Sequence, residues 1–182
     1  MREGKEEKIL ELFFDEPTKH WHFEEILNHV NISRPQAALW LKRFAMQKLV
    51  LRNKRRGKMP YYTGNCFHPA YQSKKKIFAL TRLERTGFIR HLLTLPQTKT
   101  IAAFGSFVRG DWYKESDIDL FIYGSPTGLK IEKYRRSLGR PIHLILCRNN
   151  QELTSFSQGI LKDAMAGYTI RGDFAFAGGK YA

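Results

Sequence analysis

The stretch GSFVRGDWYKESDIDL, residues 105–120, sets the architecture expected for the C-terminal half of the chain. It follows a short apolar run at 100–104 and joins a Gly-Ser turn to two aspartates that stand two positions apart. Glycine permits a tight turn and a close approach to a ligand, and the N–H groups freed there attract anions. Gly105, Ser106 and Arg109 are therefore candidate phosphate-binding residues, with the Arg109 guanidinium able to bind phosphate bidentately.

The two aspartates fall at the start of a predicted strand over 118–123. Because strand side chains alternate, Asp117 and Asp119 leave the same face, while Ile118 and Leu120 point into the core. Two adjacent carboxylates repel each other unless a cation lies between them, and Mg²⁺ accepts carboxylates together with substrate phosphates. The spacing predicts a Mg²⁺ site beside a triphosphate-binding turn, which is the equipment for phosphoryl or nucleotidyl transfer.

The longer run GSFVRGDWYKESDIDLFI resembles the GS…DxD signature of the DNA polymerase beta-like nucleotidyltransferase superfamily. It is most similar to the small "minimal" nucleotidyltransferases of archaea and bacteria, and the resemblance covers residues 101–173. An acidic pair alone is often only a solvated surface feature, but the Gly-Ser turn at the correct distance favours the functional interpretation. The family's nucleotide-binding and metal-binding positions correspond here to Gly105, Ser106, Arg109, Asp117 and Asp119.

One position departs from the family pattern. Active members carry a third carboxylate on a later strand, and in the matching run at 142–147 the alternation places His143 there. A neutral imidazole is a poorer Mg²⁺ ligand than a carboxylate, but its ordinary pKa of about 6.5 suits a general base. We therefore take Asp117, Asp119 and His143 as candidate catalytic residues. The alternatives are a nearby acid that takes the place of the third carboxylate (Asp111, Glu115 or Asp163) and a position that changed after catalysis was lost.

The fold class expected is α+β, with a small α/β nucleotidyltransferase domain that contains a mixed sheet. Its predicted strands cover 100–104, 118–123 and 142–147, and its predicted helices cover 129–138 and 152–166. A connecting helix over 69–94 precedes them, with a buried face expected from Ile77, Leu80, Phe88, Leu92 and Leu93.

The N-terminal part reads as three helices followed by a hairpin. The helices are predicted over 2–14, 23–29 and 34–48, the last with Ser33 as N-cap and Pro35 in its first turn. The stretch NISRPQAALWLKRFAMQKLVLRNKRRGKMPYYTGN closely resembles archaeal and bacterial winged-helix regulators. The domains expected are a winged helix-turn-helix at 1–66, a connecting helix at 67–98 and the nucleotidyltransferase domain at 99–182.

The formal net charge of +14 is unevenly distributed, because no acidic residue occurs between Glu25 and Glu84. Such a basic stretch favours binding of a polyanion. In a winged helix-turn-helix the third helix enters the major groove and the wing touches the backbone. The candidate DNA-binding residues are Arg34, Gln36, Lys42 and Arg43 on the helix and Arg52, Lys54, Arg55, Arg56 and Lys58 on the wing. A winged helix used for dimerisation or for RNA is the alternative.

The remaining features limit the cellular setting. Cys66 and Cys147 form no CxxC pair, which argues against a zinc site or disulfide framework. No signal pattern and no apolar run near the roughly 20 residues that span a bilayer occur, so a cytoplasmic protein without a membrane partner is expected. Winged-helix modules often dimerise, so a homodimer is compatible with the sequence, but the residues do not set the oligomeric state.

The function expected is transfer of a nucleotidyl group, AMP from ATP, to a protein or RNA acceptor. The resemblance to minimal nucleotidyltransferases implies an antitoxin-like role, in which the acceptor is often a separately encoded protein. The alternative is a DNA-binding transcriptional regulator whose nucleotidyltransferase domain is degenerate or senses an NTP, and the departure at His143 favours it. Acceptor, NTP preference and DNA sequence do not follow from the residues.

Overall fold

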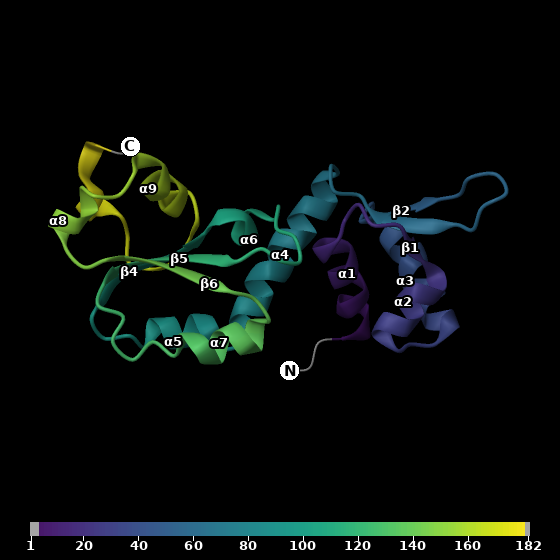
Figure 1. Ribbon diagram of the computed structural model, residues 1–182, viewed down its shortest axis with the longest axis horizontal. Helices are drawn as coiled ribbons and strands as arrows, with labels where there is room; N and C mark the ends of the chain where they lie inside the picture. The colour runs from purple at the N-terminus through teal and green to yellow at the C-terminus, as the bar shows by residue number, and fades with distance from the viewer. Residues whose placement is uncertain (1–3, 181–182) are drawn as a thin grey trace. The chain divides into compact units, whose positions relative to one another are not determined.

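The chain folds as two units in a computed structural model that describes residues 4–180 (Figure 1). The first unit runs to Ile77 and also contains Trp112–Glu115. The second comprises Phe78–Asp111 and the chain from Ser116 onward. The chain thus returns once to the first unit, between the Gly-Ser turn and the aspartate pair.

The first unit combines three helices with a small antiparallel sheet of order β1-β3-β2. Apolar residues at helical spacing, among them Phe13, Leu41 and Phe44, are fully buried and form its core. The elements are α1 (Lys5–Asp15), β1 (Trp21–His22), α2 (Phe23–Val30), α3 (Arg34–Met46), β2 (Val50–Asn53) and β3 (Tyr61–Gly64).

A buried lysine joins the returning segment to the helices of the first unit. The Lys75 side chain is only 2% exposed, and its Nζ donates hydrogen bonds to the main-chain oxygens of Phe14 and Trp112. The same ammonium lies 4.4 Å from the centroid of the Trp112 ring, close enough for a cation–π interaction. A buried charge is costly unless it is paired or hydrogen-bonded, and here carbonyl oxygens and aromatic rings supply that compensation.

The predicted connecting helix is wrong as a single element. The structure has α4 (Pro69–Arg85) and a separate α5 (Phe88–Leu93), because Gly87 adopts a left-handed φ of 76° that interrupts the helical hydrogen bonds. Phe88 and Leu92 are buried as expected, whereas Ile77 is 59% exposed and Leu93 is 49% exposed. The break turns α5 relative to α4, so one helical stripe does not extend across both.

The second unit is built on a four-stranded mixed sheet of order β6-β5-β4-β7. Strands β5 and β6 are parallel, and the other pairs are antiparallel, as a mixed sheet requires. In Figure 1, α5 and α7 lie on one side of this sheet and α9 on the other. The elements after α5 are β4 (Thr98–Phe104), α6 (Gly105–Arg109), β5 (Ile118–Gly124), α7 (Ile131–Leu138), β6 (Ile142–Cys147), α8 (Asn150–Leu153), α9 (Gln158–Met165), β7 (Tyr168–Arg171) and the 3₁₀ helix Ala175–Lys180.

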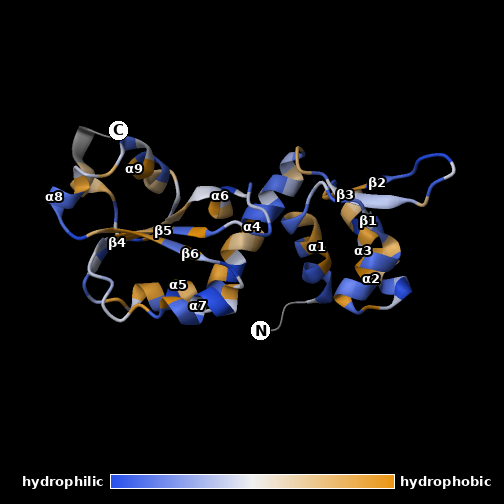
Figure 2. Cartoon of the chain, in the orientation of Figure 1, coloured by the Kyte–Doolittle hydropathy of each residue, from blue (hydrophilic) through white to orange (hydrophobic). Residues whose placement is uncertain are grey.

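Strand alternation divides β5 between two faces of the sheet. Phe121 and Tyr123 join a cluster with Leu161 and Ala164 of α9, whereas Leu120 and Ile122 are buried on the opposite face. Figure 2 shows the central strands in the hydrophobic colour, as expected for strands covered on both sides. Asp117 and Asp119 share the parity of Phe121 and therefore lie at the end of its face.

The last predicted helix is also wrong as a single element, and two strands were not predicted. Helices α8 and α9 replace a continuous helix over 152–166, because Ser157 adopts an extended conformation and its Oγ caps α9 by accepting from the Ile160 N–H. The short strands β1 and β7 exist through pairing with β3 and β4. Along the described residues, none of the helices is long and apolar enough to cross a membrane.

Candidate active site

The parallel pairing of β5 with β6 places Asp119 beside His143. The two residues are register partners, and because neighbouring strands share their pleat, both side chains leave the same face of the sheet. His143 Nδ1 lies 3.1 Å from Asp119 Oδ1, within hydrogen-bonding distance. The Asp119 side chain is 20% exposed and that of His143 is 60% exposed, so the pair lies at a solvent-accessible edge.

Asp117 completes a three-residue cluster with Asp119 and His143. One potential ligand atom from each residue can be chosen so that all of them lie within 4.8 Å of one another. A small divalent ion with bonds of about 2.1 Å keeps its ligand atoms roughly 3 to 4 Å apart. The donor set thus fits one divalent ion after a small adjustment of side chains.

Gly105 leaves room for the Asp119 carboxylate because it has no side chain. Strand β4 pairs with β5 so that Phe104 opposes Asp119, and the next residue, Gly105, turns away with a φ of 76°. A Cβ added to Gly105 would lie 2.0 Å from Asp119 Oδ2 and 3.0 Å from its Cγ. Only glycine satisfies both the left-handed backbone and the close approach.

The environment of Asp119 opposes its ionisation. Burial raises the pKa of the Asp119 carboxyl above its usual range, and the neighbouring charge of Asp117 acts in the same direction. The hydrogen bond from His143 and the positive charge of Arg109 lower that pKa and offset part of the effect. A cation beside the two carboxylates would relieve the repulsion between them.

The predicted phosphate-binding residues lie on α6, directly after β4. Ser106 is partly buried, and its main-chain oxygen accepts hydrogen bonds from the N–H groups of Gly110 and Asp111, which close the helix. Arg109 is exposed, and its Nε lies 3.4 Å from Asp111 Oδ2. An exposed ion pair of this kind is weak, so a phosphate can displace it at little cost.

Sequence reasoning missed Arg140, a buried cation next to the aspartate pair. Arg140 is almost fully buried, its Nη1 donates to the Ser116 oxygen at 3.0 Å, and its guanidinium lies 5.5 Å from the centroid of the Phe107 ring. It thus connects the loop before β6 to α6 and to the residue preceding Asp117. No motif or periodicity marks it; the only signal was a lone arginine between a glycine and a proline.

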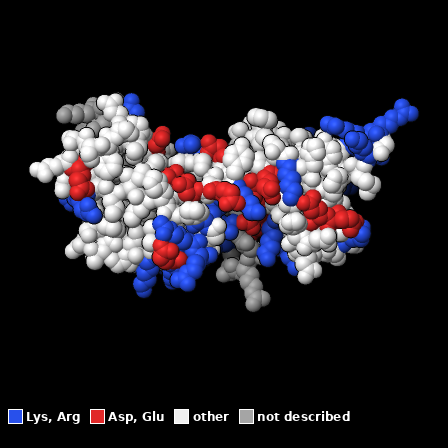
Figure 3. All heavy atoms as spheres, viewed as in Figure 1, with Lys and Arg blue, Asp and Glu red and all other residues white. Residues whose placement is uncertain are grey.

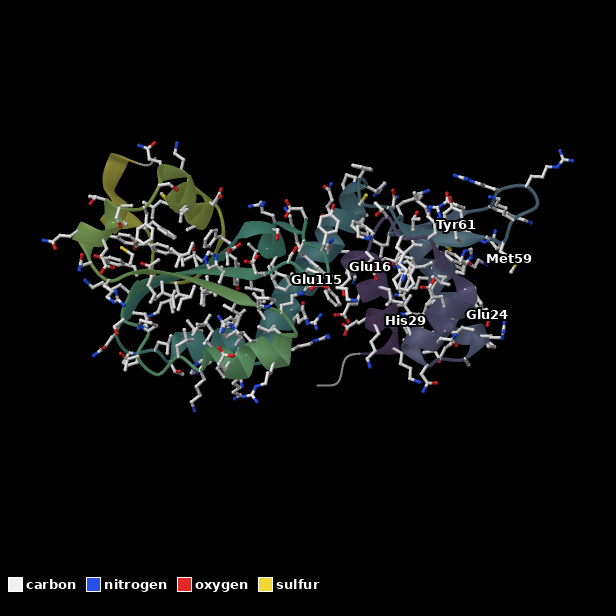
Figure 4. All side chains as sticks on the ribbon, viewed as in Figure 1. Glu16, Glu24, His29, Met59, Tyr61 and Glu115 are labelled. Carbon is white, nitrogen blue, oxygen red and sulfur yellow. The ribbon has the colours of Figure 1, made fainter. Side chains whose placement is uncertain are left out.

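The predicted DNA-binding side chains lie on α3, on β2 and in the turn between β2 and β3. Gln36 and Lys42 are exposed on α3, and Arg52 is exposed on β2. Four further basic residues follow in the turn before β3, where blue side chains gather in Figure 3: Lys54, Arg55, Arg56 and Lys58. Arg34 pairs with Glu24, labelled in Figure 4, and Arg43 pairs with Glu6 at 3.6 Å. Both pairs are exposed and therefore contribute little stability.

An apolar groove lies between α3 and the β2–β3 hairpin. It encloses about 440 Å³, and its wall contains Ala38, Met46 and Tyr62, with Lys42 and Arg52 as its cations. The α3 surface is thus mixed in character, with small apolar groups between the polar ones.

Comparison with known families bears on the second unit. Residues 86–165 match the nucleotidyltransferase domain family. This match, just under half of the chain, contains the Gly105 turn, both aspartates and His143, and it supports a DNA polymerase beta-like nucleotidyltransferase and nucleotidyl transfer as its function. No curated protein and no solved structure matches the chain significantly.

Proposed function

We propose that the nucleotidyltransferase domain transfers a nucleotidyl group, AMP from ATP, to a protein or RNA acceptor. The observation that carries this proposal is the cluster of Asp117, Asp119 and His143 beside the Gly105 turn, within the residues that match the family. Gly105, Ser106 and Arg109 would bind the triphosphate, and the aspartates would hold a divalent ion, for which Mg²⁺ was the expectation. When bound, the ion would neutralise the negative charge of the phosphates.

Transfer of α-labelled ATP tests the proposal directly. The full chain is incubated with labelled ATP and a divalent metal ion, with the protein itself, RNA and the products of neighbouring genes as candidate acceptors. We expect transfer by the native chain, loss in Asp117→Ala and no loss in Asp163→Ala, which removes an exposed carboxylate of α9 outside the cluster. Transfer that is indifferent to Asp117→Ala would refute the proposal.

The second candidate is a DNA-binding regulator whose nucleotidyltransferase domain senses an NTP or is degenerate. The replacement of a carboxylate by His143 favours it. A His143→Asp variant separates the two functions: transfer only by that variant shows an intact scaffold that lacks one ligand. ATP binding without transfer by either protein makes the regulator the better description.

For the first unit we infer a winged helix-turn-helix that binds DNA through α3 and the β2–β3 hairpin. The order α1-β1-α2-α3-β2-β3, the sheet order β1-β3-β2 and the basic turn of the hairpin support this inference. Gln36 and Lys42 would read bases, whereas the basic residues of the turn would contact phosphates. Such a protein could act as an antitoxin that represses its own operon while modifying a separately encoded partner, and a homodimer would match a palindromic site.

The salt dependence of DNA binding tests this inference. Removing four phosphate contacts should reduce the slope of log K against log salt by about 3 to 4. The variant replaces Lys54, Arg55, Arg56 and Lys58 with glutamine, and its control makes the same charge change at the exposed Lys99, Lys133, Arg136 and Lys162. Equal slope changes in the two variants would show a general cationic attraction and contradict a DNA-binding hairpin.

A further inference from the structure

The cluster of Asp117, Asp119 and His143 differs from a carboxylate-only site in the chemistry of its third group. His143 is placed by a strand and not by a loop, because β6 pairs with β5 and holds His143 in register with Asp119. Its Nδ1 already contacts Asp119 Oδ1 at 3.1 Å. The imidazole thus occupies the position where a third oxygen ligand is expected for Mg²⁺.

Ligand chemistry separates Mg²⁺ from the transition metals at such a site. Mg²⁺ is a hard ion that prefers oxygen and keeps its waters, whereas Fe²⁺, Co²⁺ and Zn²⁺ bind imidazole nitrogen well. Two carboxylates with one imidazole form a mixed oxygen and nitrogen donor set. That set retains the charge needed for a divalent ion and adds a ligand that discriminates against Mg²⁺.

We propose that Asp117, Asp119 and His143 together bind one divalent transition-metal ion of the Fe²⁺, Co²⁺ or Zn²⁺ class in preference to Mg²⁺. This proposal rests on the proposed nucleotidyl transfer, because it names the ion that accompanies the nucleotide in that site. His143 is a ligand in this arrangement, so the coordinating nitrogen is not available as a general base. The ion has one protein nitrogen and two protein oxygens as ligands, and its remaining positions are open to water or phosphate.

The arrangement of the neighbouring residues supports ligation by the imidazole. Most of the His143 side chain is exposed and Asp119 is partly exposed, so an ion in solvent can reach both groups. Gly105 fixes the other side of the same carboxylate, since a side chain there would overlap Oδ2. Asp119 is thus held between a turn without a side chain and an imidazole that faces the cluster.

Co²⁺ alone, added to the full chain without nucleotide, tests the proposal. Its visible absorption reports the ligand field, and its paramagnetism shifts the proton signals of a coordinated imidazole far from the normal range. We expect shifted imidazole signals and displacement of Co²⁺ only by a large excess of Mg²⁺. In His143→Asp the shifted signals should disappear, and the selectivity for Co²⁺ over Mg²⁺ should fall by about tenfold or more.

His22→Asp is the matched control. It makes the same substitution at an exposed residue in the extended N-cap position of α2, where aspartate is favoured. Its selectivity should equal that of the native chain. Unchanged selectivity in His143→Asp, or Co²⁺ bound without shifted imidazole signals, would overturn the proposal and leave His143 as a hydrogen-bonding partner of Asp119.

These outcomes are independent of the transfer reaction. If Co²⁺ shows imidazole ligation but labelled ATP is never transferred with any ion, the metal preference stands and nucleotidyl transfer fails. If transfer occurs and His143→Asp leaves the metal selectivity unaltered, nucleotidyl transfer stands and the metal preference fails.

Discussion

Gly105→Ala is the substitution that most directly probes how the candidate site is built. Alanine in the left-handed region costs roughly 1 to 2 kcal/mol. The new Cβ would also lie 2.0 Å from Asp119 Oδ2 and 3.3 Å from its Cβ, so the carboxylate must swing away from the position it shares with His143. A side-chain rotation is cheap, so the main loss falls on the geometry of the cluster rather than on stability.

Gly87→Ala is its matched control. Gly87 has the same φ of 76°, and nothing lies within 4 Å of a Cβ placed there. Both variants should lower the melting temperature by about 2 to 8 °C, from the backbone cost alone. Only Gly105→Ala should lose binding of the divalent ion.

Thermal unfolding and calorimetric titration with Co²⁺ measure the two effects separately. Metal binding by Gly105→Ala that equals binding by Gly87→Ala would refute the reasoning, because it would mean that the position of the Asp119 carboxylate does not matter. Native-like stability of Gly87→Ala would refute the backbone part of the estimate.

The remaining predictions concern charge and burial. Because the pKa of Asp119 is raised in the folded chain without metal, ionisation of this carboxyl group disfavours folding at neutral pH. Asp119→Asn should therefore raise the melting temperature at pH 7, and this gain should disappear as the pH falls below the ordinary carboxyl pKa. An unchanged or lower melting temperature at pH 7 would contradict the prediction. Lys75→Met should lower the free energy of unfolding by about 1 to 3 kcal/mol, because two buried main-chain oxygens lose their hydrogen-bond donor. Urea denaturation measures this change, and a loss near zero would contradict a stabilising role of the Lys75 hydrogen bonds. Burial raises the pKa of the Cys147 thiol, so a thiol reagent should modify Cys66 first at neutral pH, and mass spectrometry showing the reverse order would argue against burial of Cys147.

The elements predicted best from the sequence were those with a long apolar pattern. Strand alternation placed Asp117 and Asp119 on one face, the resemblance to the family placed His143 beside them, and the structure brings the three side chains together. The two aspartates could be placed because they lead into β5, a central strand whose residues are mostly buried, and β6 pairs with β5 in parallel with His143 opposite Asp119. The roles assigned to these residues stay predictions until transfer and metal binding are measured.

Elements that depend on partners far away in the chain were not predictable. Strand β1 has two residues and exists because it pairs with Tyr61 and Tyr62 of β3. Two residues are too few to show the alternation by which a strand is predicted from sequence. The break at Gly87 depends on a single backbone angle, although the glycine itself was a signal. Arg140 was missed for a similar reason, since its role depends on the distant Ser116 oxygen.

The return of residues 112–115 to the first unit has a consequence for dissecting this protein. A fragment that starts at Phe78 would contain every residue of the metal cluster, yet it would lack Lys75, whose ammonium holds the main chain and ring of Trp112. That indole, fully buried in the whole chain, would then lose its contacts with Phe14 and Lys75, only five positions before Asp117. Inactivity of such a fragment would therefore report the loss of a tether and not the absence of catalytic groups, so point variants of the full chain are the sound way to assign function.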